Sequence, residues 1–526
     1  MRKKLSILLA TVMAAGCAFG MTACGKKSTG AKEGVLQIRY FEGGYGGEWL
    51  EHALESYAAE NEGFKYDPIP DANVTSQINT YLQSGKNLSD IYIIQTGNWS
   101  EWVSQGYLAN LTDVYEAEVD TSTGKRKIKD YMDQELVDRY YMQKYAGQGE
   151  FLPWVLPEAS ISTSFVYNED YLLSTPHTTT REGRYEAGTT WTAPPETVEE
   201  LLDYCNDLNA RKWGKGSDFE APIAWPGNAS HWLKFFLYTW FAQYQGVHEE
   251  NALNASTIAG EGSYYDFWNF ASAEVWKMTG IQVAIETLQS IFFDEDGDYQ
   301  YSLDNVGSSS VQRAEQDFVR GKCALLVGGS FFYNEMRGNI DWDEDGEDDY
   351  TYKMMYLPTV VNAEQKEDGT TKKMVFYSTE EMMLVPAKAK NLEMAKDFLA
   401  YLFNEENNLY FTKMTGTMRP FDYDPIALAG EDYEWKPFEK SVLDMYNEAD
   451  VKLYAYPAGQ SQEDVSRIYR YQMPDIFGQH GWATFYSAMR KYTGEEIMET
   501  GHGSSYKSVY DVTKGDYRIW FNRYYD

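Results

Sequence analysis

The sequence predicts an α/β protein in which mostly parallel sheets are flanked by helices. Near the N-terminus, three apolar runs of strand length alternate with segments whose apolar residues recur at helical spacing. Such β-α-β-α-β alternation is typical of a parallel sheet with helices outside it. The chain has 526 residues, which is too long for one ordinary core, so we expect two or three packed units.

The first series of elements begins after a polar N-terminal segment. Each predicted strand is a short apolar run, and the residues between the strands place their apolar side chains on one face of a helix. We expect strands over 35–40, 64–68 and 90–94, and helices over 49–58, 74–82 and around Trp102 and Val103.

A second series starts after two prolines in 152–157 interrupt the alternation. Thr197 and Glu200 have the spacing of a capping box, which opens a helix that carries Cys205 on its apolar face. Residues 221–244 are apolar on most faces and are therefore expected to be buried if helical. Further elements are predicted as a strand over 160–170 and a helix over 275–291.

The first indication of a ligand site comes from the segment AEQDFVRGKCALLVGGSFFY. Helical spacing predicts a helix that ends at Gly321, since glycine suits the left-handed conformation of a helix C-terminus. Residues 323–327 form a strand-length run, and the glycines at 328–329 let the backbone turn after it. Ligands of open α/β folds lie outside the carboxyl ends of strands, which favours a ligand site for the aromatic residues that follow. Alternatively, Phe331 and Phe332 cap a hydrophobic layer.

The C-terminal part of the chain predicts fewer elements. A strand is expected over 374–386, followed by a long amphipathic helix that ends before Gly416. The last hundred residues are polar and rich in Tyr, and they predict only mixed helix. Cys205 and Cys323 are expected to be buried free thiols, although an oxidising exterior would permit a bond between them.

The N-terminus has the features of a targeting segment, with three basic residues before a short apolar run. The residues MTAC that follow resemble a bacterial lipobox, which implies removal of residues 1–23 and attachment of diacylglycerol to Cys24. Two acyl chains anchor a protein durably, and the polar residues 24–34 suit a flexible tether. We therefore expect the protein on the outer face of the cytoplasmic membrane, held only by lipid. The alternative is ordinary secretion with Cys24 retained as a thiol.

Charge and hydropathy exclude several classes of partner. The formal net charge is −34, which argues against binding to nucleic acid or to an anionic membrane surface. No apolar run after the targeting segment approaches the ~20 residues that span a bilayer. Aromatic residues make up 16% of the chain, so some aromatic surface is expected to remain partly exposed. We expect a monomer.

Four segments of the chain occur in a recognisable order. They are SDIYIIQTGNWSEWVSQGYLANLTD, SFVYNEDYL with the downstream PPETVEELLDYC, FVRGKCALLVGGSF, and VPAKAKNLEMAKDFLAYLFNEEN. Together they resemble the extracellular solute-binding proteins of ATP-driven sugar importers, the family that includes maltose-binding protein. Ser89 and Val198 stand where that family commonly has Pro and Trp. The resemblance covers about residues 35 to 420 and depends on the order and spacing of the segments, since no single motif is specific.

The resemblance implies a two-lobed fold of the periplasmic-binding-protein type II, with ligand held between the lobes. It also implies the substrate-binding component of an ABC transporter, which captures an oligosaccharide by hinge closure and delivers it to the transmembrane permease subunits. Carried onto this chain, the division is lobe one at 35–155 with 380–418, lobe two at 160–375 with 420–526, and hinge crossings near Pro157, Tyr377 and Arg419.

A sugar presents apolar ring faces surrounded by hydroxyls, so its site needs flat aromatic side chains and planar polar ones. The resemblance places the loop after the third predicted strand at the cleft. Arg419 is alternatively a salt bridge between the lobes, and Trp154 and Trp232 are alternatively buried. The candidates for ligand contact are Glu42, Tyr45, Asn98, Trp99, Trp154, Trp225, Asn228, Trp232, Phe331 and Arg419.

An acidic loop matches the first half of a calcium-binding loop, with oxygen-bearing side chains at alternate positions before and after a glycine. The twelfth position is Tyr352, so the usual bidentate glutamate is missing. A solvated acidic loop is the alternative, and no other cofactor is expected. The candidate calcium ligands are Asp341, Asp343, Asp345 and Glu347.

Three further functions compete with a sugar importer. A glycosidase needs two carboxylates about 5–10 Å apart, and no motif among the 80 acidic residues singles out such a pair. The six His residues show no metal spacing, and no GxSxG, Walker A or HExxH motif occurs. The remaining two are a surface lipoprotein that captures polysaccharide without a transporter, and an importer protein for a peptide or polyamine. We expect a binding protein and no enzyme.

Overall fold

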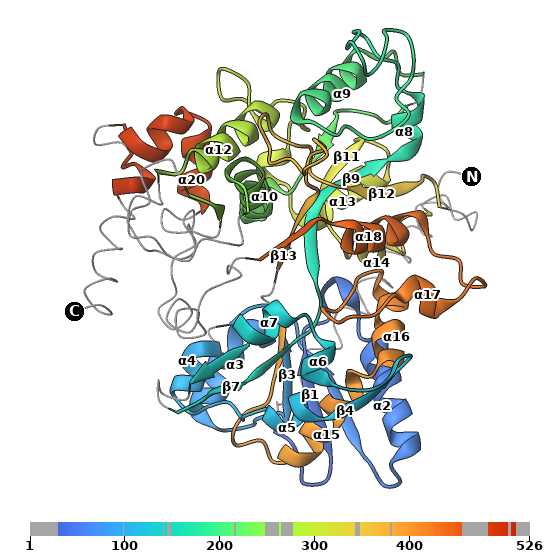
Figure 1. The fold of residues 1–526 in the computed structure, drawn as a ribbon, viewed down its shortest axis with the longest axis vertical. Coiled ribbons are helices and arrows are strands. Elements are labelled where there is room, and N and C mark those ends of the chain that lie inside the picture. Colours follow the sequence, from blue (N-terminus) through green and yellow to red (C-terminus); the bar gives the residue numbers. More distant parts are fainter. Residues whose placement is uncertain are drawn as a thin grey trace, which may run out of the picture.

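The computed structural model places the chain in two lobes, each built around its own sheet (Figure 1). The described residues are 30–97, 99–139, 141–144, 149–214, 217–247, 262–264, 277–341, 348–378, 381–454, 482–502 and 506–511. Residues 1–23, Cys24 and Asn98 lie outside them. In Figure 1 the blue and cyan N-terminal elements form the lower lobe together with orange α15 and α16.

The sheet of the first lobe has five strands in the order β2-β1-β3-β14-β8. β1 pairs in parallel with β2 and β3, whereas β14 is antiparallel to both β3 and β8. The strands are β1 (Leu36–Tyr40), β2 (Tyr66–Pro70), β3 (Ile91–Ile94), β8 (Val155–Pro157) and β14 (Met382–Leu384). The main helices are α2 (Glu48–Glu60), α3 (Val74–Ser84), α4 (Trp99–Ser104), α5 (Thr112–Glu116), α15 (Leu392–Leu402) and α16 (Glu405–Thr415).

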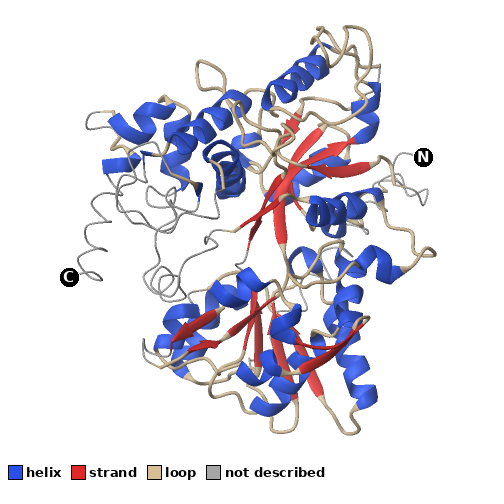
Figure 2. Cartoon of the chain, in the orientation of Figure 1, coloured by secondary structure: helices blue, strands red, loops and turns tan. Residues whose placement is uncertain are grey.

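The sheet of the second lobe has the order β10-β11-β9-β13-β15, and β12 also pairs with β9. Figure 2 shows the strands inside each lobe with helices around them. The strands are β9 (Ile161–Asn168), β10 (Ile223–Ala224), β11 (Leu325–Gly329), β12 (Tyr352–Met355), β13 (Met374–Ser378) and β15 (Val451–Leu453). The main helices are α8 (Glu169–Ser174), α9 (Val198–Ala210), α10 (Leu233–Gln245), α12 (Thr279–Phe292), α13 (Val311–Val319), α14 (Phe332–Met336), α18 (Pro437–Glu448) and α20 (Trp482–Met489).

Two short connections join strands of one sheet directly to strands of the other. β8 continues into β9 through residues 158–160, and β13 ends at Ser378 shortly before β14 begins at Met382. After α16 the chain pairs Met418 with Ser160 and then enters α17 (Pro425–Ala429). The two-lobed α/β fold is confirmed. The pairing is mixed rather than mostly parallel, because β9 and β14 arrive from the other lobe and run antiparallel to their neighbours.

Local sequence signals explain several boundaries. The Thr197 hydroxyl accepts a hydrogen bond from the Glu200 amide, and the Glu200 carboxylate accepts one from the Thr197 amide, so the predicted capping box is present at α9. Gly321 has φ +73°, as predicted for the residue after α13. The expected single helix before Gly416 is instead two, because the Asn404 side chain accepts a hydrogen bond from the Asn407 amide and begins α16.

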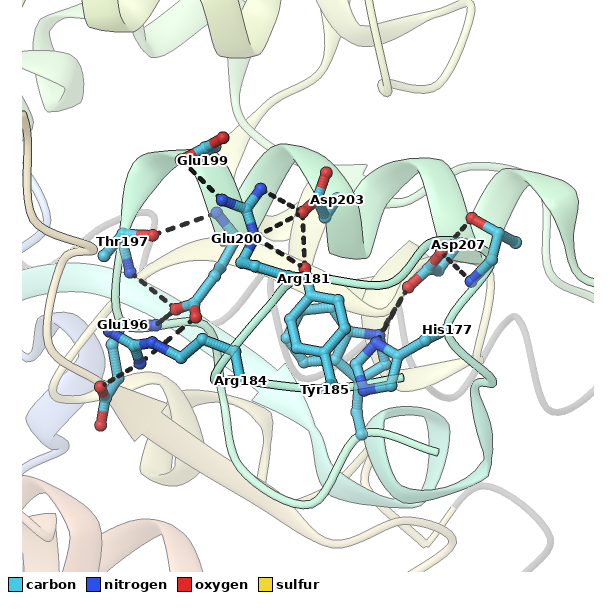
Figure 3. A network of polar contacts seen from close by, with 12 residues as sticks. His177, Arg181, Arg184, Tyr185, Glu196, Thr197, Glu199, Glu200, Asp203 and Asp207 are labelled. Carbon is cyan, nitrogen blue, oxygen red and sulfur yellow. Dashed lines mark hydrogen bonds and ion pairs between the residues drawn. The ribbon is translucent and has the colours of Figure 1, made fainter. Parts of the chain in front are cut away.

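Hydrophobic burial divides into two clusters: the first fills lobe one and continues into lobe two through residues such as Phe318 and Phe332, and the second lies within lobe two. The α10 helix is buried on nearly all sides, as its composition predicts. Cys205 and Cys323 are buried free thiols, in agreement with the prediction. The loop before α9 is fastened to that helix by a polar network, in which Asp207 accepts hydrogen bonds from the Thr178 amide and the Trp191 indole (Figure 3).

Candidate ligand-binding site

A cavity of about 410 Å³ lies between the two lobes. The loop after β1 and the end of β3 supply its lobe-one side, and the two strand crossings supply its floor. The lobe-two side comes from the turn before α10, the start of α13, and α14. The lining residues are Phe41, Gly43, Gly44, Tyr45, Gln95, Glu158, Asn228, Trp232, Ser310, Val311, Gln312, Phe331, Glu335 and Glu381.

Three aromatic rings form one wall of this cavity. Phe331 lies between Tyr45 of lobe one and Trp232 of lobe two, with ring-centroid distances of 5.8 Å and 6.0 Å and edge-on geometry in both pairs. A Cβ atom on Gly44 would lie 2.5 Å from Phe331 Cδ2, so glycine is needed for the close approach of this loop. The Asn334 side chain donates a hydrogen bond to the Gly44 carbonyl at 2.6 Å. The rings therefore lie where the two lobes meet.

Carboxyl groups line another part of the cavity. Glu158 follows β8 at the first crossing and is only 4% exposed. Burial raises its pKa to about 8, although the charge of Arg419 acts in the opposite direction. Burial also raises the pKa of Glu335 and that of the Tyr45 hydroxyl, and the Glu381 and Glu158 carboxylates raise the Tyr45 pKa further. The cavity thus combines aromatic faces with acidic groups.

Four of the sequence-predicted ligand residues line the cavity, namely Tyr45, Asn228, Trp232 and Phe331. Glu42 is exposed and precedes this wall, but its side chain is not part of the lining. These four residues come from separate parts of the sequence, and the fold brings them together.

Three tryptophans that were predicted to contact the ligand are buried in the lobe cores and do not line the cavity. Trp99 begins α4 and is 1% exposed, because the helix turns its ring into the core of lobe one. Trp154 is buried in the same core. Trp225 packs against Phe292 with 4.8 Å between ring centroids, and its indole donates a hydrogen bond to the Ser302 hydroxyl. Their expected place in the ligand wall is therefore corrected.

Arg419 is fully buried beside the hinge and does not line the cavity. Its guanidinium donates hydrogen bonds to the Glu158 carbonyl and the Asn408 side chain, both at 3.2 Å, and lies 4.2 Å from the Phe411 ring. Burial lowers its pKa to about 10. Arg419 thus braces the first crossing against lobe one by a hydrogen bond to a backbone carbonyl. This role is neither the ligand contact nor the salt bridge between lobes that the sequence suggested.

Sequence reasoning missed the acids and amides of the cavity. Glu158 directly follows Pro157, so its position at a predicted crossing was an available signal. Glu335 lies one helical turn after Phe331 and therefore shares its face of α14. Gln95 and Gln312 carry no comparable signal, since only the packing of the two lobes places them together.

The predicted calcium loop is only partly described. Asp343, Asp345 and Glu347 lie outside the described residues, and Asp341 precedes them. The neighbouring Asp348 accepts a hydrogen bond from the Tyr333 hydroxyl at 2.7 Å. Within the described ranges, no group of three His, Cys, Asp or Glu side chains could hold a metal ion. The calcium site stays a prediction. In the same ranges, every helix is too short or too polar to cross a membrane.

Two sheet-centred lobes, strand crossings and a cavity between the lobes define a ligand-binding protein of the two-lobed class. Residues 53–424, more than half of the chain, match the family model described as bacterial extracellular solute-binding protein. The chain belongs to this family. Among curated proteins, no relative matches the sequence.

Solved structures show the same fold at low identity. A chitin oligosaccharide binding protein has 16% identity and a TM-score of 0.54, covering 88% of this chain and 99% of its own. A sugar transporter from Bacillus licheniformis in complex with stachyose has 14% identity and a TM-score of 0.52, with 92% and 100% covered. A Streptomyces coelicolor protein described as a probable secreted solute-binding lipoprotein has 12% identity and a TM-score of 0.54, with 88% of this chain and 98% of its own covered.

Proposed function

We propose that this protein captures a carbohydrate between its lobes and delivers it to the transmembrane subunits of an ABC importer. The observation that carries the proposal is the wall of Tyr45, Phe331 and Trp232 inside the inter-lobe cavity. Flat aromatic faces cover the apolar faces of sugar rings, while the amides and carboxyls of the cavity suit the hydroxyls. Neighbours of the same fold are described as binding stachyose and chitin oligosaccharide, which supports this class of ligand.

Capture requires the lobes to close on the ligand. The crossings between β8 and β9 and between β13 and β14 are short, so a rotation at them would move one lobe against the other. A ligand favours the closed state only through contacts that it makes better there, and a wall with rings from both lobes supplies such contacts. A lipid attached to Cys24 would keep the protein near its permease.

A thermal-shift screen tests this proposal. The mature protein would be melted with oligosaccharides derived from mannan, xylan, starch and fructan. A ligand at 100 times its Kd should stabilise the protein by about 2.7 kcal/mol, with saturation at one ligand per chain and without turnover. Hydrolysis of the oligosaccharide would favour a glycosidase. Stabilisation only by peptides or polyamines would favour an importer for another solute.

The anchor has a separate test. In a bacterial host, the native chain should fractionate with membranes, and Cys24→Ala should be released into the medium with its fold intact. Release of the native chain would contradict the lipid anchor without affecting the ligand proposal.

A further inference from the structure

The buried carboxylates of this protein fall into two groups. Away from the cavity, each buried acid has a hydrogen-bond donor or a cation. Glu200 accepts from two backbone amides and pairs with Arg184, and Asp207 accepts from Thr178 and Trp191 (Figure 3). The same holds for Asp90, Asp317 and Glu439.

Within the described part of the chain, such partners are lacking for buried Glu158, buried Glu315 and half-buried Glu335. Glu315 in α13 is 1% exposed, and neither of its carboxylate oxygens has a hydrogen bond. It faces Glu335, which lines the cavity, and Glu335 also lacks a hydrogen-bonding or ion-pairing side chain. Glu158 also lines the cavity, and its carboxyl likewise lacks a hydrogen-bonding or ion-pairing side chain; Arg419 acts on it only at longer range.

An ionised carboxylate in a buried site is costly when no cation lies beside it, because its charge has lost the stabilisation that water provides. Among the described residues that line the cavity, Glu158 and Glu335 are acids and none is Lys, Arg or His. The site therefore has unused capacity to accept hydrogen bonds and positive charge. With a neutral ligand these carboxyls stay protonated or ionise at a cost, whereas a cationic ligand supplies the counter-charge that lets them ionise.

We propose that the cargo is a carbohydrate that carries a protonated amine, with the ammonium group placed between Glu158 and Glu335. This rests on the proposed function, and it names the class of sugar. Ammonium–carboxylate hydrogen bonds are short and strong in such a site. The rings of Tyr45, Phe331 and Trp232 would cover the sugar and present their faces to its charge. Glu315 lies behind Glu335, where burial and the charge of Glu335 raise its pKa, and it does not line the cavity.

Isothermal titration calorimetry at pH 6 with matched sugars tests the proposal. One set is the β-1,4-linked trimer of glucosamine, its N-acetylated form and the glucose trimer of the same linkage. The second set compares galactosamine and mannosamine with galactose and mannose. We expect at least one amine to bind at least tenfold more tightly than its neutral counterparts. Glu158→Gln and Glu335→Gln should each reduce that preference at least fivefold.

Glu55→Gln, which changes an exposed glutamate on α2, is the matched control and should leave all affinities unchanged. Melting curves establish whether each variant is folded. Because Glu158 and Glu335 are substituted separately, the test remains valid if one of the two variants does not fold. Equal or tighter binding of the neutral sugars, or no binding of any amine, overturns the cationic cargo. Neutral binding would still support the proposed function. Binding of spermidine alone, with no response to any sugar, overturns both.

Discussion

Replacing Glu158 with Gln tests whether the cavity holds an uncompensated acid in the ligand-free protein. The carboxyl is buried at the first crossing and faces Tyr45 and, at longer range, Arg419. Gln has nearly the same shape and cannot ionise. The substitution therefore removes the charge while it preserves the packing of the hinge.

The sign of the effect follows from the direction of the pKa shift. Burial raises the pKa of Glu158 from 4.5 to about 8, so the folded state holds the proton more tightly than the unfolded state. Stability is therefore lost as the pH rises from about 4.5 to about 8, where the cost of ionisation is complete. Each pKa unit corresponds to about 1.4 kcal/mol, which sets an upper bound of about 5 kcal/mol above pH 8. Water that enters the cavity as the lobes open will lower this cost of ionisation, and we expect a destabilisation of about 1–3 kcal/mol above pH 8.

Thermal melts of the native protein and of Glu158→Gln, with Glu55→Gln as control, measure this effect at pH 5 and pH 8. The variant should melt several degrees higher than the native protein at pH 8, since about 1 kcal/mol corresponds to about 2–4 °C in a domain of this size. The difference should shrink toward zero at pH 5, where the native carboxyl is protonated in the folded state. A difference that is equal at both pH values, or a variant that melts lower at pH 8, would refute the reasoning.

Other substitutions probe the placement of the predicted residues. Phe331→Ala should weaken binding of the sugar found by the screen by about 1–3 kcal/mol in calorimetry; unchanged affinity would remove the ring from the site. Trp99→Ala should lower the free energy of unfolding by about 3–5 kcal/mol in denaturant titrations, because its ring is in the core; a loss of affinity alone would contradict that burial. Arg419→Lys should destabilise by about 1–3 kcal/mol, since an ammonium cannot repeat the guanidinium contacts; an unchanged melt would argue against the brace. Cys205 and Cys323 should react with a thiol reagent only after unfolding, because both are buried; rapid labelling of the folded protein would contradict this.

The local elements of the fold were readable from the sequence because they depend on nearby residues. Helical and strand periodicity predicted β1, β3, α3 and α9 to within about two residues, and the Thr197 capping box set the start of α9. The glycines before Phe331 predicted a change of direction near the end of β11, and Phe331 does lie at the cavity. The strand expected over 374–386 is divided between the two sheets, which periodicity could not detect.

The sequence by itself determined the α/β elements, the acidic surface and the presence of an aromatic segment after β11, since these follow from composition and spacing. Only the tertiary structure decided which side chains share the cavity. Trp99 and Gln95 belong to the same loop region, yet α4 turns the tryptophan into the core and leaves the glutamine at the cavity. Glu158 became a site residue only through burial at a crossing between lobes. Burial and charge compensation depend on contacts between residues far apart in the chain, which is why no local pattern revealed them.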